Sequence, residues 1–97
     1  MSRPELLNEK EIEDQLVDFP LWNRDGALII KEVVCSNFAS VVGLVNSIAF
    51  LAEKFDHHPD LLIYGWNKLR ITLSTHVRGG LTELDFKLAK QIDYLKI

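Results

Sequence analysis

Three imidazoles in one stretch of this sequence could carry out acid–base chemistry. All three histidines of the 97-residue chain, His57, His58 and His76, lie between Glu53 and Asp85. Imidazole is the side chain whose ordinary pKa lets it take up and release a proton near neutral pH. Such a set suits a dehydration, in which one proton leaves a nitrogen atom and another assists the departure of hydroxide.

Backbone signals in the same stretch place these histidines at the ends of predicted elements. Neighbouring side chains on a straight strand point to opposite sides, so His57 and His58 can reach one ligand only if the chain bends. Pro59 marks such a bend, because it biases the preceding residue toward extended backbone. His76 ends an alternating run, 69–75, that predicts a strand.

A metal site is the main competing interpretation of the histidines. Zinc commonly takes three protein ligands at a catalytic site. However, adjacent histidines rarely share one tetrahedral ion, and the sequence contains no His-x3-His or Cys-x2-Cys spacing. A serine nucleophile is unsupported, because Ser74 has no G-x-S-x-G elbow or acidic third member with it. No phosphate-binding glycine motif predicts a nucleotide site, and a structural role for the histidines stays open.

The stretch resembles the pterin-4a-carbinolamine dehydratases, also known as dimerisation cofactors of a homeodomain transcription factor. The family pattern is met at fixed spacing by Glu53, His57-His58-Pro59, Trp66, His76 and Asp85. A weaker resemblance extends from about residue 7 to residue 94. Two departures are that Leu61 stands where animal members carry a tryptophan, and that the hairpin is one residue longer.

The resemblance implies dehydration of 4a-hydroxytetrahydrobiopterin to quinonoid dihydropterin and water, in tetrahydrobiopterin recycling after aromatic amino-acid hydroxylation. It implies no metal and no organic cofactor. His57 and His76 would form the proton-transfer pair, with His58 positioning the pterin. The substrate-binding residues would be Glu53, Pro59, Thr75, Val77, Arg78 and Asp85. The alternative is a non-catalytic binding or assembly module, a dimerisation cofactor of the same fold.

Two of these residues, Asp85 and Glu53, allow a second interpretation. Asp85 can cap the last helix as well as orient a group of the site. Glu53 can end a helix or accept hydrogen bonds from a donor edge of a bicyclic ring. Trp66 is expected to pack on the hairpin.

Composition and charge limit the class of protein. The chain has a net charge of −3 and a pI of about 5.5, which argues against a nucleic-acid partner. A single cysteine, Cys35, suits a reducing compartment. Neither a signal-type segment nor an uninterrupted apolar run that approaches about 18 residues is found, so we expect a cytoplasmic protein without a membrane partner. One domain, 1–97, with a thin core would gain from forming a homodimer or homotetramer.

The predicted elements are single helices that alternate with pairs of strands. A helix capped by Asn8 ends at Pro20, and strands 21–24 and 27–35 flank an Asp25-Gly26 turn. A long helix, apolar most of the way round, runs to about Lys54, and strands 62–64 and 69–75 form a second hairpin. A flexible loop, 78–80, leads to a last helix capped by Thr82. The order α-β-β-α-β-β-α predicts an α+β fold, with a four-stranded antiparallel sheet and three helices on one face.

Overall fold

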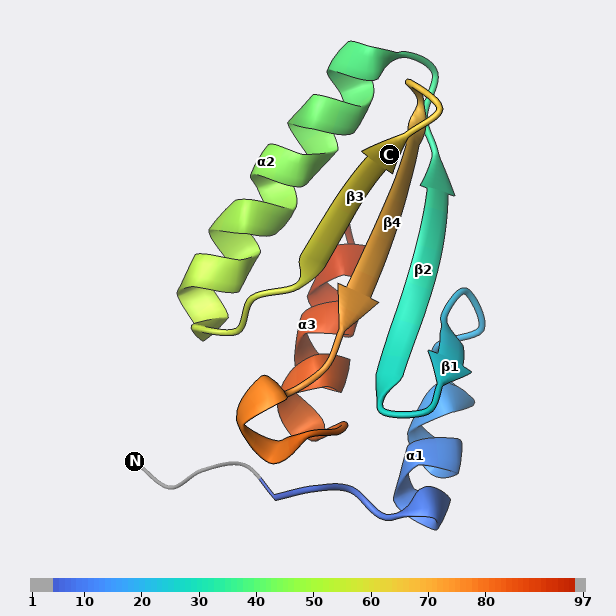
Figure 1. The fold of residues 1–97 in the computed structure, drawn as a ribbon, viewed down its shortest axis with the longest axis vertical. Helices are drawn as coiled ribbons and strands as arrows, with labels where there is room; N and C mark the ends of the chain where they lie inside the picture. The colour runs from blue at the N-terminus through green and yellow to red at the C-terminus, as the bar shows by residue number, and fades with distance from the viewer. Residues whose placement is uncertain (1–4, 96–97) are drawn as a thin grey trace.

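Three helices cover one face of a four-stranded antiparallel sheet in the computed structural model (Figure 1). The structure describes residues 5–95, so the first four and last two residues of the predicted domain lie outside the described residues. The helices and strands are α1 (Glu9–Leu16), β1 (Asn23–Asp25), β2 (Leu28–Val34), α2 (Phe38–Phe55), β3 (Asp60–Tyr64), β4 (Lys68–Leu73) and α3 (Glu83–Asp93), with a short 3-10 helix η1 (His76–Arg78) before α3. The predicted fold class and element order are confirmed.

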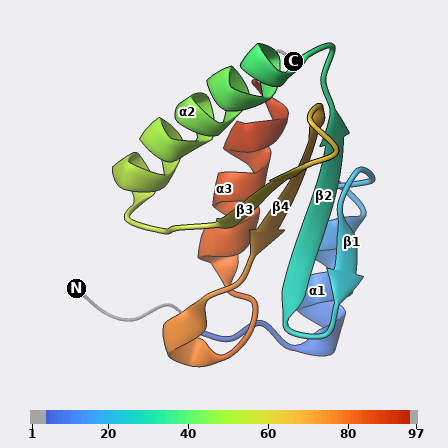
Figure 2. The ribbon, with the colours of Figure 1, turned by 45° about the horizontal axis from the view of Figure 1, so that its top comes forward.

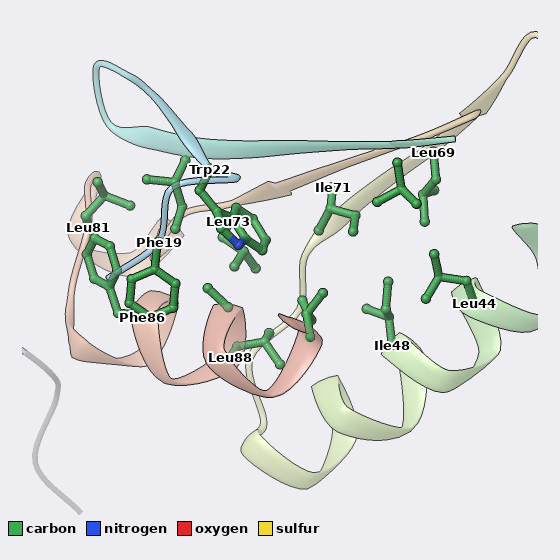
Figure 3. Packing of buried hydrophobic residues seen from close by; sticks show 14 of the residues in the cluster. Phe19, Trp22, Leu44, Ile48, Leu69, Ile71, Leu73, Leu81, Phe86 and Leu88 are labelled. Carbon is green, nitrogen blue, oxygen red and sulfur yellow. The ribbon is translucent and has the colours of Figure 1, made fainter. Parts of the chain in front are cut away.

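The sheet has the strand order β1-β2-β4-β3, so β2 and β4 are central. β2 pairs with β4 from Ile29 opposite Leu73 to Val34 opposite Lys68. Side chains alternate between the two faces of a strand, and Leu69, Ile71 and Leu73 accordingly point from β4 toward the helices (Figure 3). The face of β4 that carries these three side chains therefore forms one side of the hydrophobic core.

The core lies between this face and α2 and α3, which lie on the same side of the sheet (Figure 2). Trp22 is 4% exposed and belongs to this core. Burying a large apolar side chain contributes about 1.5–3 kcal/mol. The helical side chains that do so are Val41, Leu44, Ile48, Phe86, Leu88 and Ile92.

Local signals set the helix ends. The predicted capping boxes of Asn8 with Glu11 and of Thr82 with Asp85 are both present. Asn37 caps α2, and Asp56 ends it in the left-handed conformation, at φ 49°. Glycine and asparagine are the residues usually found at such a helix end. The reversal at Asp56 determines how the chain leaves α2 toward β3.

The second hairpin differs from its prediction at three points. β3 begins at Asp60 rather than Leu62, and β4 ends at Leu73 rather than Thr75. Beyond Leu73 the Ser74 hydroxyl donates to the Ala27 carbonyl, and Thr75 pairs with Gly80 across a closed turn instead of continuing the pairing with a neighbouring strand. His76 therefore begins η1 instead of ending a strand, and the loop predicted at 78–80 is a hydrogen-bonded turn.

Apolar side chains are exposed at two places, in the turn of the second hairpin and on the outer side of α2. Trp66 is 64% exposed in the turn between β3 and β4, so the expected packing on the hairpin is wrong. By length and composition α2 could cross a bilayer, although its inner side packs on the core. Its outer side exposes Phe38, Val42 and Phe50. The predicted helix with two apolar faces is thus present, and one of these faces is covered by the fold.

Candidate active site

One predicted histidine lies in a buried hydrogen-bonded cluster. The Nε2 atom of His57 is 2.6 Å from Oδ1 of Asp85, and the hydroxyl of Thr75 donates to Oδ2 at 2.8 Å. Asp85 is fully buried and His57 is 7% exposed. These three residues were all predicted as site residues, and the structure brings them together from three separate segments.

Each segment delivers its side chain for a local reason. At the end of α2, the N–H of His57 bonds back to the carbonyl of Ala52, which turns the side chain of His57 inward. Antiparallel pairing places the start of β3 and the end of β4 at the same end of the sheet, where Thr75 follows β4. Asp85 lies in the first turn of α3, where the helix dipole favours a negative charge.

Asp85 serves the helix and the histidine at once. Its Oδ2 also accepts the backbone N–H of Thr82 at 2.9 Å, which is the capping interaction that the sequence predicts. Both predicted interpretations of Asp85, helix cap and partner of a site group, therefore describe contacts in this structure. Burial of a carboxylate is tolerated only where hydrogen bonds replace water. Among the described residues no buried side-chain polar atom lacks such a partner.

The second histidine lies at the surface instead. His58 Nε2 is 2.6 Å from Oε2 of Glu53, in the last turn of α2, and the two side chains are 60% and 76% exposed. The adjacent histidines thus point into different surroundings, with His58 outward and His57 inward. Pro59 follows, half-buried, immediately before β3.

The third histidine is next in the sequence to Thr75, a member of the buried cluster. His76 follows Thr75 directly and is exposed, as is Val77. Arg78 is half-buried, and its guanidinium is 3.8 Å from a carboxylate oxygen of Glu5. The backbone N–H groups of residues 78 and 79 both bond to the Thr75 carbonyl, so the turn that carries His76 is tied to the cluster.

The cluster offers a proton-exchanging group beside a fixed negative charge. An imidazole paired with a carboxylate can accept a proton and hold it as an imidazolium, which is the requirement for a general base. Within residues 5–95, no group of three or more His, Cys, Asp or Glu side chains is arranged to hold a metal ion. The pairing of His57 with Asp85 is thus an arrangement that can support proton transfer.

Sequence reasoning identified Thr82 as a helix cap but missed its second contact. Its hydroxyl lies 2.8 Å from the Thr75 hydroxyl, in the buried cluster. The T-x-x-D spacing signals a cap in any sequence. The contact with Thr75 depends on how the end of β4 meets α3, and no local pattern reports that.

The chain is similar to known proteins over most of its length. Residues 5–95 match the family described as "Pterin 4 alpha carbinolamine dehydratase". A Roseiflexus castenholzii protein provisionally named pterin-4-alpha-carbinolamine dehydratase is 49% identical over 88 residues, which are 91% of this chain and 94% of the relative. A Nocardia farcinica protein with the same provisional name is 44% identical over 91 residues, which are 94% of this chain and 95% of the relative.

Two solved structures share the fold. The crystal structure of a transcriptional coactivator/pterin dehydratase from Brucella melitensis has a TM-score of 0.86 and 31% identity, covering 92% of this chain and 96% of that one. A pterin dehydratase-like protein identified as a RuBisCO assembly factor in the alpha-carboxysome has a TM-score of 0.60 and 20% identity, covering 74% of this chain and 82% of that one. At that identity the second likeness concerns the fold alone.

Proposed function

The chain belongs to the pterin 4 alpha carbinolamine dehydratase family, and from that membership we propose that it converts 4a-hydroxytetrahydrobiopterin to quinonoid dihydropterin and water. The observation that carries the proposal is the buried pairing of His57 with Asp85. A histidine oriented by a carboxylate is suited to moving protons near neutral pH.

The reaction needs two proton transfers, for which we assign His57 and His76. One imidazole takes the proton of the ring nitrogen next to the 4a carbon, and the other gives a proton to the 4a-hydroxyl. The carbon–oxygen bond breaks, water leaves, and a carbon–nitrogen double bond forms. The substrate loses one proton and one hydroxide, so the atoms balance, and exchange with solvent resets the two imidazoles. No cofactor is required.

The other predicted residues would hold the pterin. His58, fixed by Glu53, positions the substrate at the surface side of the site. The backbone at Pro59, and that of Thr75, Val77 and Arg78, frames the pocket from the two chain segments beside the cluster, and Asp85 acts through His57. We place this activity in one domain, 1–97, of a cytoplasmic protein that serves tetrahydrobiopterin recycling beside an aromatic amino-acid hydroxylase.

A dehydratase assay with freshly generated carbinolamine tests the proposal directly. We expect purified protein to accelerate formation of the quinonoid product over the spontaneous reaction. Treatment with EDTA should leave the rate and the fold unchanged, because the histidines act as acids and bases. A rate equal to the spontaneous one would refute the dehydratase. Loss of the rate in EDTA with recovery in zinc would refute the metal-free mechanism.

The outer face of α2 supports a second proposal, self-assembly into a homodimer or homotetramer. Phe50 is 79% exposed and Phe38 is 54% exposed on one helix. Large exposed apolar patches on a small protein usually mark an interface. Such a face would also serve the alternative role of the chain as a binding or assembly module, and that role does not exclude catalysis.

Sedimentation measures the assembly. Wild type should sediment as an oligomer at micromolar concentration, and Phe50→Glu, which places a charge in the interface, should shift it toward monomer. Phe50 does not belong to the buried core, so circular dichroism of the variant should match wild type. A compact wild-type monomer at every concentration would rule the assembly out.

A further inference from the structure

A chain of hydrogen bonds runs from the backbone of α3 to His57. The N–H of Leu84 donates to the Thr82 hydroxyl at 3.2 Å, and that hydroxyl is 2.8 Å from the hydroxyl of Thr75. Thr75 in turn donates to Asp85 Oδ2, and Asp85 Oδ1 meets His57. Thr75, Thr82 and Asp85 are all buried, at 3% exposure or less.

If every contact in this series is a hydrogen bond, the hydroxyl protons of Thr75 and Thr82 can be arranged in a single way. Each hydroxyl has a single proton to donate. Thr75 gives its proton to Asp85, so Thr82 must give its own to Thr75, and Leu84 supplies the bond that Thr82 accepts. The reverse order would set two oxygen atoms, of Thr75 and of Asp85, 2.8 Å apart with no proton between them. In a buried site that contact would be costly.

The same order determines the state of the carboxylate and the histidine. Asp85 Oδ2 accepts two donors, from the Thr75 hydroxyl and from the Thr82 backbone N–H. Oδ2 therefore carries no proton. A carboxylate is a weaker base than an imidazole, so a proton between Oδ1 and the ring belongs to the ring. The ring nitrogen that faces Oδ1 must carry a proton, and that nitrogen is Nε2 of His57.

We propose that Thr75 and Thr82 are positioning residues that, through Asp85, hold His57 as the Nε2–H tautomer and leave Nδ1 as the nitrogen that takes up a proton. The assignment of that nitrogen to catalysis rests on the proposed dehydratase function. The tautomer itself does not, because it follows from contacts within the protein. The two can therefore be tested apart.

Nuclear magnetic resonance of 15N-labelled protein without substrate reads the tautomer. Long-range 1H–15N correlations distinguish Nε2–H from Nδ1–H in a neutral imidazole, and the variant His57→Gln assigns the signal. Wild type should show His57 as Nε2–H. A wild-type Nδ1–H signal would overturn the proposal, whatever the dehydratase assay shows. A missing dehydratase activity with an Nε2–H signal would refute only the function.

Asp85→Asn should reverse the tautomer. The Thr82 backbone N–H can only donate, so the amide oxygen of the new side chain must face it, and the amide nitrogen must then face His57. An NH₂ group opposite Nε2 requires that nitrogen to lose its proton. We expect an Nδ1–H signal and a fall in kcat of up to about 10²-fold, no larger than that of His57→Gln, because Asp85 acts through His57 and its loss produces the wrong tautomer. A folded variant that retains Nε2–H would overturn the proposal.

Thr75→Val tests the threonine without disturbing the helix cap. The backbone N–H of Thr75 still bonds to Gly80, so the turn is kept. We expect kcat to fall about tenfold with KM within about twofold, and an Nδ1–H population to appear. Thr75→Ser should restore both, because it returns the hydroxyl. Thr72→Val, the same change on the outward side of β4, is the matched control. Unchanged kcat and tautomer in Thr75→Val would overturn the proposal.

Discussion

Helix α3 carries an aspartate at each end that contacts residues distant in the sequence, and the two aspartates differ in their partners and in their burial. Asp85, in the first turn, is fully buried and faces His57 and two threonines. Asp93, in the last turn, is 25% exposed at its side chain and accepts from the ammonium of Lys31 at 2.7 Å and the indole N–H of Trp22 at 3.0 Å. Both contacts join α3 to distant parts of the chain.

The difference shows that burial of a carboxylate does not by itself indicate chemistry. A lysine–aspartate ion pair contributes charge attraction and not proton exchange in the neutral range. An imidazole exchanges its proton there. The helix dipole adds to the contrast, because it favours Asp85 at the N-terminus and opposes Asp93 at the C-terminus. We therefore expect the first contact to govern activity and the second to govern stability.

The largest expected effect comes from removing the titrating partner. His57→Gln keeps an N–H donor for Asp85 but cannot exchange a proton, so kcat should fall by about 10²-fold or more. His76→Ala should act similarly, and the double variant should lose much more than either single one, because the two imidazoles can partly replace one another. Steady-state kinetics measures this, with circular dichroism as the folding control. Wild-type rates in the folded double variant would leave only the binding-module role.

Asp93→Ala should give the opposite result, a loss of stability without loss of activity. The change leaves the ammonium of Lys31 buried without a carboxylate, which we expect to cost about 2–4 kcal/mol of unfolding free energy, reduced from a fully buried pair because Asp93 is partly exposed. Urea denaturation measures it. Lys31→Met combined with Asp93→Asn removes both charges and should recover most of the loss. A large fall in kcat at a temperature where Asp93→Ala is folded would break the comparison.

The sequence predicts the contacts of Asp85 better than it predicts the contact between Lys31 and Asp93. The cap formed by Asp85 is a local pattern that the sequence predicts, and the structure shows it. The role of Asp85 at a site, which the resemblance implies, stays a prediction, although Asp85 does contact His57. Lys31 interrupts an apolar strand, and the pattern left open which face is buried. Its partner lies 62 positions away, a separation that no periodicity reports. The inward turn of His57 likewise depends on the left-handed backbone of Asp56, which is not a residue type that signals a helix end strongly.

His58 gives a smaller effect and sharpens the contrast between buried and exposed histidines. Its pair with Glu53 is exposed, so it contributes little to stability. His58→Ala should raise KM several-fold with kcat within about threefold, because a positioning contact is made before the transition state. Glu53→Gln, which keeps an acceptor for His58 but removes the charge, is the companion variant. A fall in kcat as large as that of His57→Gln would move His58 into the proton-transfer pair.

The smallest effect is expected for Glu32, a carboxylate on the sheet face away from the helices. It accepts from Arg70 Nε at 2.6 Å and from the Tyr64 hydroxyl, and the hydrogen bond from Arg70 lowers the pKa of the Glu32 carboxyl below its ordinary value of 4.5. A lowered pKa contributes stability above the unfolded-state value, and that contribution is lost as the pH falls through the folded-state value.

Glu32→Gln should therefore lower the melting temperature at pH 7 by no more than about 2 °C, since the pair is exposed to solvent and screened by salt. The gap between the variant and wild type should begin to close near pH 4.5 and vanish at lower pH, because the wild-type carboxyl then becomes neutral like the amide. Thermal melts of the two proteins from pH 7 downward measure the gap. A gap that widens as the pH falls would contradict the assigned direction of the pKa. A loss of stability as large as that of Asp93→Ala would show that exposure to solvent does not explain the difference in stability contribution between Glu32 and Asp93.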